Sequence, residues 1–209
     1  MLTRKTKILD FGSSEGSHIN EIVKNTKINK HNVYIADIDK NALNRGRKKF
    51  GFKTILIRKN SILPFRNKYF DIVYSNSVIE HVTHEISQYP QVEKKRIWKI
   101  NSNKEFRKNA LKNQNKFAKE IIRLGKNYFV QTPYKHFPIE SHSWLPFVQY
   151  LPRPILISSI KILNLFWIKK TQPDWNLLLM SDMKKFFPDS KIIQEKRLGF
   201  IKSIMSLNN

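Results

Sequence analysis

Short apolar segments alternate with helix-like spacings along most of the chain. Residues 8–9, 32–37, 54–58, 69–74 and 127–131 read as such segments. Their length and composition are typical of strands buried in a parallel sheet. Before the last of them, Glu105–Leu124 places apolar side chains at helical spacing, and Gly125 supplies an end to that helix. Strands that alternate with helices predict an α/β fold.

The last part of the chain adds two more strands to this pattern. Segments 191–196 and 200–205 are predicted to pair around Gly199, after a short helix that Ser181 would cap. The sheet would then hold about seven strands. A chain of 209 residues suits one domain with a substantial core, so we expect a single domain over 1–209.

Two stretches interrupt the alternation of strands and helices. Residues 83–104 are polar and contain a proline, which indicates a surface insertion. Residues 132–175 lie between the fifth and sixth strands and are rich in proline and tryptophan, which suits a lid over a substrate. Inside this lid region, 154–168 is apolar but too interrupted by polar residues to span a bilayer. We expect burial or a partly exposed patch there rather than membrane insertion.

A tight loop follows the first strand and carries the clearest candidate chemistry. Small residues crowd from Gly12 to Ser17, between an apolar strand end and the start of a helix. Such a loop lets the backbone approach a ligand closely, and free amides at the helix start favour polar or anionic groups. Asp37 ends the second strand, where an acid can accept both hydroxyls of a ribose, while Asp39 is placed to cap the next helix.

Charge and cysteine content limit the classes of protein that fit. The chain has no cysteine, which excludes disulfides, thiolate metal sites and cysteine nucleophiles and favours a cytoplasmic protein. No apolar signal-peptide stretch precedes the first strand, in agreement with that expectation. The net charge of +23 would serve nucleic acid, an anionic membrane or a phosphorylated substrate. Because the lysines are scattered, we favour a compositional origin over a basic binding face.

Three ordered motifs resemble one family of enzymes. The motifs ILDFGSSEG, VYIADID and LPFRNKYFDIVYSNSVIEHV are similar to those of class I S-adenosylmethionine-dependent methyltransferases, in the type 11-like branch. The later FVQTPYKHFPIESHSWLPF, residues 129–147, resembles a signature of a bacterial subgroup. The resemblance implies a doubly wound, mostly parallel, Rossmann-like sheet of seven strands whose last strand is antiparallel. It also implies S-adenosyl-L-methionine as the cofactor.

The resemblance implies a set of cofactor-binding residues. They are Asp10, Gly12, Ser14 and Gly16 at the methionine end, Asp37 and Ile38 at the ribose, Asn60 and Ser61 beside adenine, and Ser75 and Asn76 beneath the sulfonium. Ser14 replaces the usual middle glycine, which is tolerated unless that position needs a positive φ. The acid often found near adenine is absent, with Asn60 or Ser61 as its stand-in.

Four residues are candidates for removing a proton from the methyl acceptor: His142, His81, Glu140 and Glu80. Glu140 and His142 are two residues apart, so an extended backbone would point both side chains into the same cleft. An imidazole titrates near neutrality and therefore suits the role of base. We rank His142 slightly above His81, because a neighbouring carboxylate could orient its ring and raise its basicity. The alternative is that these side chains only tie the loop and the lid together.

We expect no metal ion at these residues. A site on Glu80 and His81 would resemble that of certain small-RNA methyltransferases, but the additional glutamate of those enzymes, three residues earlier, is Ser77 here.

The sequence excludes some methylation chemistries and leaves two functional classes open. An Asn/Asp-Pro-Pro-aromatic motif for amino-group methylation is missing at Ser75–Val78, and cysteine-dependent pyrimidine methylation is excluded. The first class is O-methylation of a small molecule, glycan or lipid-linked intermediate, with contact to a membrane surface left open. The alternative is an RNA methyltransferase or a protein that binds S-adenosylmethionine without turnover.

Overall fold

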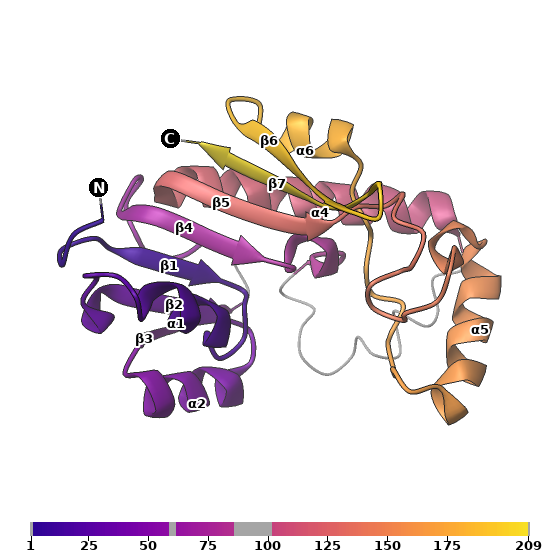
Figure 1. Cartoon of the computed structure of the whole chain (residues 1–209), viewed down its shortest axis with the longest axis horizontal. Coiled ribbons are helices and arrows are strands. Elements are labelled where there is room, and N and C mark those ends of the chain that lie inside the picture. Colours follow the sequence, from indigo (N-terminus) through magenta and orange to yellow (C-terminus); the bar gives the residue numbers. More distant parts are fainter. Residues whose placement is uncertain (1, 59–61, 86–101, 209) are drawn as a thin grey trace.

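A seven-stranded sheet with the order β3-β2-β1-β4-β5-β7-β6 forms the centre of the molecule (Figure 1). The computed structural model describes residues 2–58, 62–85 and 102–208. The strands are β1 Ile8–Phe11, β2 Val33–Asp37, β3 Lys53–Leu56, β4 Phe70–Asn76, β5 Gly125–Pro133, β6 Lys191–Arg197 and β7 Phe200–Asn208. Strands β1 to β5 pair in parallel, whereas β7 is antiparallel to both β5 and β6. The predicted α/β, doubly wound, mostly parallel sheet is confirmed.

Helices cover both faces of this sheet, and all four residues of β1 are therefore buried. Ile8 packs with α1 and α2, whereas Leu9 and Phe11 pack with α4 and α6. Figure 1 shows α4 on the far side of the sheet. The helices are α1 Ser17–Val23, α2 Lys40–Phe50, α4 Asn103–Leu124, α5 Arg153–Phe166 and α6 Met180–Phe186, with 3-10 turns η1 Lys30–Asn32, η2 Ile79–His81 and η4 Val148–Tyr150.

Residues 134–179 leave the sheet between β5 and α6 and carry α5 at the end of the molecule opposite β3 (Figure 1). They have a small core of their own, in which Leu156 and Ile160 of α5 pack against Trp175. No helix among the described residues is both long and apolar enough to cross a membrane. These residues contain most of the predicted lid.

Two details of the sequence-based assignment are wrong, and one lies partly out of view. Ser181 sits inside α6, because the helix begins earlier and Asp182 Oδ2 accepts from the Leu179 amide at 2.9 Å. The start of the predicted surface insertion is buried, since Thr83 Oγ1 donates to the Asp174 carbonyl at 2.9 Å. Most of that insertion, 86–101, lies outside the described residues.

The positions of Asn60 and Ser61, predicted beside adenine, also lie outside the described part of the chain. Their predicted role is therefore untested.

Gly46 fixes how closely α2 approaches the loop after β1. A Cβ atom added there would lie 2.3 Å from the Glu15 carbonyl oxygen and 2.6 Å from Ile35 Cδ1. Gly46→Ala should therefore destabilise the fold by about 1–3 kcal/mol, which outweighs the gain of about 1 kcal/mol in helix propensity. Urea denaturation measures the change. Asn44→Ala on the exposed face of α2 is the control, and it should not lower stability. A Gly46→Ala variant as stable as the wild type would contradict this packing.

Candidate active site

The loop between β1 and α1 turns through left-handed backbone at three of its residues. Gly12 has φ 92°, Ser14 has φ 63° and Gly16 has φ 80°. The Gly12 amide donates to the Ala36 carbonyl at 2.7 Å, which anchors the loop to β2. Ser14 therefore has the positive φ that favours glycine at this position. A non-glycine residue there costs roughly 1–2 kcal/mol unless its surroundings compensate.

Asp37 compensates for this strain and closes the loop against β2. Its Oδ2 accepts the Ser14 amide at 2.8 Å, and its Oδ1 accepts the Asp39 amide at 2.9 Å. Burial raises the pKa of the Asp37 carboxyl, while these backbone hydrogen bonds oppose the shift. Each carboxylate oxygen retains capacity for a further donor. Ile38 follows with its side chain 40% exposed beside this position.

Asp10 is a fully buried acid whose two carboxylate oxygens have no hydrogen-bond partner among the described residues. Burial raises its pKa to about 7, and the negative charge of Asp37 adds to the shift. Its charge in turn adds to the effect of burial in raising the pKa of Tyr74 to about 12. A buried carboxyl without partners is costly unless a cation or donor joins it. Asp10 thus fits a cofactor that carries an ammonium group.

The end of β4 lies next to this loop. Ser75 is fully buried, and its Oγ donates to the Phe11 carbonyl at 3.0 Å. Both Ser75 and Asn76 belong to β4 itself, whereas the sequence placed them just beyond the strand. Ser77 then leaves the sheet with φ 54°, and its Oγ donates to Gln131 Oε1 at 2.9 Å. The chain is thereby tied to β5 at the point where η2 begins.

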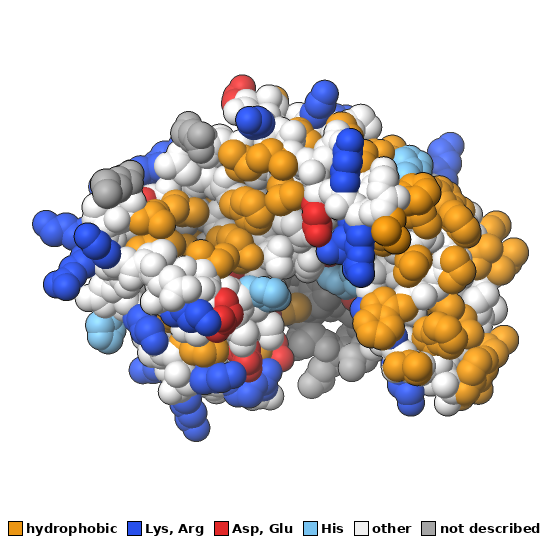
Figure 2. Space-filling view, viewed as in Figure 1, with side chains coloured by type: hydrophobic (Ala, Val, Ile, Leu, Met, Phe, Trp, Pro, Cys, Tyr) orange, Lys and Arg blue, Asp and Glu red, His pale blue; other side chains and the backbone are white. Residues whose placement is uncertain are grey.

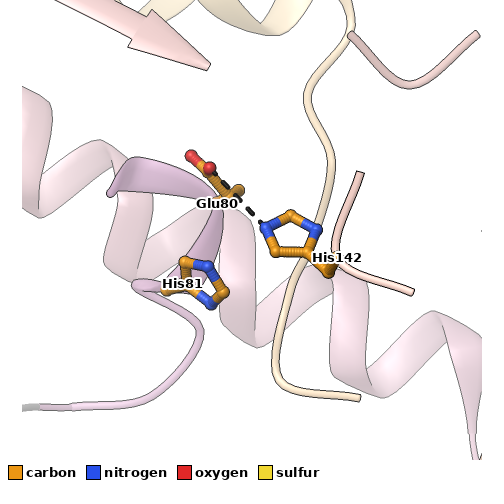
Figure 3. A group of neighbouring side chains, drawn as sticks. All are labelled: Glu80, His81 and His142. Atoms are coloured by element: carbon orange, nitrogen blue, oxygen red, sulfur yellow. Dashed lines mark ion pairs between the residues drawn. The ribbon is translucent and has the colours of Figure 1, made fainter. Parts of the chain in front are cut away.

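Glu80, in η2, is fully buried between the sheet and residues 134–179. Its Oε2 accepts from Thr132 Oγ1 at 2.9 Å, and its backbone carbonyl accepts the Asn176 amide at 2.8 Å. Its Oε1 has no hydrogen-bond partner among the described residues and lies 3.8 Å from His142 Nε2. Figure 3 marks this ion pair between Glu80 and the His142 ring with a dashed line.

His142 is held between two carboxylates. Its Nδ1 lies 2.5 Å from Glu140 Oε1, and its ring stacks on Trp175 with centroids 5.6 Å apart. Burial lowers the pKa of His142, but the hydrogen bond with Glu140 and the negative charges of Glu140 and Glu80 outweigh burial and raise it to about 9. The imidazole is therefore protonated at neutral pH. The edge of His81 lies against this ring at 4.7 Å between centroids.

Glu140 reaches His142 through a turn and not through an extended backbone, so the expected geometry is wrong. Its Oε2 accepts from both the amide and the hydroxyl of Ser143 at 2.7 Å, and its Oε1 accepts the His142 amide at 2.8 Å. Burial raises the pKa of Glu140, but these interactions with His142 and Ser143 outweigh it and lower that pKa. The four candidate residues nevertheless lie close together.

Several residues of this cluster were missed by sequence reasoning. Asp174 Oδ2 lies 3.5 Å from His81 Nδ1, and Thr132 and Trp175 contact Glu80 and His142 as described above. They carried no local signal, because their partners lie far away in the sequence. Only the density of prolines and tryptophans in 132–175 indicated that this region approaches the site.

Three residues of the cluster are close enough to share a metal ion. Glu80, His81 and His142 each offer one ligand atom, and these atoms lie within 4.8 Å of one another (Figure 3). Ser77, where a further glutamate would be needed for the small-RNA methyltransferase arrangement, is occupied with Gln131. The expectation of no metal stays a prediction.

A cavity of about 570 Å³ opens beside this cluster. It lies between the ends of β4 and β5, the residues after β5, and the hairpin of β6 and β7. Its lining is mostly apolar, with Tyr134, Phe137, Trp144 and Phe200 among its residues, and Glu140 lies in its wall. The cavity has the size of a small-molecule site.

Comparisons with known proteins agree with this layout. Residues 9–100 match a family model described as a methyltransferase domain. No curated protein sequence matches the chain significantly.

Solved structures share the fold at low sequence identity. One is a SAM-dependent methyltransferase from Aquifex aeolicus, with a TM-score of 0.50 and 13% identity over 99% of this chain and 83% of that one. Another, from Mesorhizobium loti, gives 0.53 and 11% over 99% and 92%. A third, from the complex of the Haloferax volcanii Trm112 methyltransferase activator with a putative methyltransferase, gives 0.56 and 9% over 99% and 83%.

The cofactor of such enzymes is S-adenosylmethionine, whose ammonium group suits the unpartnered Asp10 carboxyl, and they transfer a methyl group to an acceptor. The family match over residues 9–100 and the shared fold support a class I S-adenosylmethionine-dependent methyltransferase of the type 11-like branch.

Proposed function

We propose that the chain methylates an oxygen atom of a small molecule, glycan or lipid-linked acceptor, with His142 as the base that takes the acceptor proton. The observation that carries this proposal is the contact of His142 with Glu140, which lies in the wall of a mostly apolar cavity at the ends of β4 and β5. Methyl transfer needs an acceptor held in line with the sulfonium and a group that removes its proton.

The cofactor would lie along the ends of β1, β2 and β4. In this proposal Asp10 receives the ammonium group, and the small residues Gly12, Ser14 and Gly16 let the backbone surround the methionine end closely. The second carboxylate, Asp37, with Ile38 beside it, accepts the ribose hydroxyls through its remaining lone pairs.

On the acceptor side of the same proposal, Ser75 and Asn76 form the floor beneath the sulfonium. S-adenosylmethionine supplies a methyl group already activated by that sulfonium. Residues 132–175 would act as the lid that covers the acceptor.

His142 must lose its own proton before it can accept one from the acceptor. Glu140 orients the ring through Nδ1, so that Nε2 is the atom available for proton transfer. Glu140 thus acts as a positioning residue. His81 and Glu80 would adjust the charge around Nε2, since His81 lies against the ring and Glu80 Oε1 faces it at 3.8 Å.

The alternative is an RNA methyltransferase or a protein that binds S-adenosylmethionine without turnover. The net charge of +23 favours it. On the face shown in Figure 2, however, basic side chains are spread out, whereas hydrophobic ones gather over the end that carries α5. This distribution supports a small or lipid-linked acceptor over nucleic acid.

Replacing Asp10 tests the cofactor fit. In the folded protein the Asp10 pKa is about 7, above its unfolded value. Its ionisation therefore lowers stability as pH rises from about 4 to 7, and Asp10→Asn should remove this decline. The variant should also bind S-adenosylmethionine more weakly. Calorimetric unfolding at pH 5 and pH 8 without cofactor, together with binding titrations, measures both effects. A variant that keeps the decline and the affinity would contradict the assignment.

Asp37→Ala tests the ribose contact. Loss of a charged acceptor should cost roughly 1.5–3 kcal/mol, or about one to two decades of affinity for S-adenosylhomocysteine in isothermal titration. Asp39→Ala is the matched control, because Asp39 caps α2 through the amides of Asn41 and Ala42. This control should lower stability with little effect on affinity. Unchanged affinity in Asp37→Ala would exclude the ribose role.

The pH dependence of turnover tests the base. If His142 is the base, kcat/KM should rise with pH and level off near the His142 pKa of about 9. Glu140→Gln removes a carboxylate that raises this pKa, so its profile should level off at lower pH. His142→Ala should lower kcat by about two to four decades and abolish the rise of kcat/KM with pH. An unchanged profile in Glu140→Gln would mean that these residues only hold the lid. The assay requires an acceptor, found first by a screen with labelled cofactor against cell fractions.

A further inference from the structure

Helix α5 has two apolar faces, although a helix on a protein surface needs only one. Its inner face is buried, with Leu156, Ile157 and Ile160 packed into the core of residues 134–179. These positions recur at three- and four-residue spacing, as expected for the side of a helix that faces a core.

The opposite face of α5 is apolar and exposed. Ile155 is 53% exposed, Ile162 is 58% exposed and Phe166 is 70% exposed, and the spacings of seven and four residues place them on one side of the helix. Leu165, in the last turn of α5, is 81% exposed, and Ile168, just beyond the helix end, is 88% exposed. We call these five residues the α5 tip surface. Figure 2 shows hydrophobic side chains gathered over this end of the molecule.

The segment that carries the α5 tip surface contains basic residues but no acidic ones. From residue 143 to residue 173 the sequence contains no aspartate or glutamate, but it contains Arg153, Lys161, Lys169 and Lys170. Lys161 and Lys170 are exposed, and Arg153 is buried. An exposed apolar face on a segment that carries cations and no acidic residues complements an anionic lipid surface.

The α5 tip surface also adjoins the mouth of the cavity. Trp167 Nε1 donates to the Ser143 carbonyl at 2.8 Å, which holds the end of α5 against residues 141–144. Lys169 Nζ lies 4.7 Å from the centre of the Trp144 ring, and Trp144 lines the cavity with 55% of its surface exposed. Amphipathic rings of this kind favour the level of lipid headgroups.

We propose that the α5 tip surface docks this enzyme on the surface of a membrane that contains anionic phospholipids. The helix lies in the interface and does not cross it. Leu165, Phe166 and Ile168 enter the region between headgroups and acyl chains, and the neighbouring lysines meet lipid phosphates. Docking brings the cavity mouth at Trp144 to the lipid surface. The proposal depends neither on the base nor on the acceptor, although a lipid-linked acceptor would reach the cavity from this side.

Vesicle flotation with the purified full chain tests the proposal. The wild type should float with vesicles of phosphatidylcholine and phosphatidylglycerol, less with phosphatidylcholine alone, and less as salt rises. Leu165→Glu/Phe166→Glu should lower the partition coefficient by about tenfold or more, because it replaces inserted apolar side chains with anions. Circular dichroism checks that this variant is folded.

The control separates docking by α5 from general attraction of a basic protein. Leu2→Glu/Ile22→Glu changes the net charge by the same amount at two exposed apolar residues, and it should bind vesicles nearly as well as the wild type. Equal losses in both variants, or no vesicle binding by the wild type, would overturn the proposal. So would self-association that Leu165→Glu/Phe166→Glu abolishes without any vesicle binding, since a second copy of the chain would then cover this surface.

Discussion

The buried carboxylate of Glu80 is the constraint around which the two parts of this protein are joined. A fully buried acid needs compensation, and Glu80 obtains it from β5 through Thr132 and from residues 134–179 through His142. The surrounding contacts extend this connection, because Gln114 of α4 donates to the carbonyls of both Ile79 and Asn176. The 3-10 turn η2 after β4, helix α4 and residues 134–179 are therefore joined by one polar network.

The sheet and residues 134–179 contribute different interactions to the candidate site. The ends of β1 and β2 hold a loop in strained backbone, with Asp37 supplying the hydrogen bond that makes Ser14 acceptable. Among the described residues the carboxylate oxygens of Asp10 have no hydrogen-bond partner, so this end of the sheet has an acceptor available for a ligand. The insertion instead supplies charge balance, through Glu140 on His142 and Asp174 beside His81.

Sequence reasoning predicted the sheet well because apolar runs and helical spacing are local signals. It predicted Asp39 as the cap of α2 for the same reason. It failed where a contact joins distant residues: no pattern near Thr132 or Asp174 indicates that they meet Glu80 and His81. Glu140 and His142 were brought together for the wrong reason, since a tight turn, and not an extended backbone, places the carboxylate on Nδ1.

The cavity of about 570 Å³ takes one wall from the hairpin of β6 and β7, and the side chains of that wall differ from the rest of the sheet in their exposure. Leu198, at the turn, is 91% exposed, and Phe200 is 55% exposed, so neither is part of the buried core. Replacements at these positions cost little folding energy and leave the cofactor loop untouched. Substitutions along this hairpin can therefore reshape one wall of the cavity independently of the loop between β1 and α1, which belongs to a different part of the sheet.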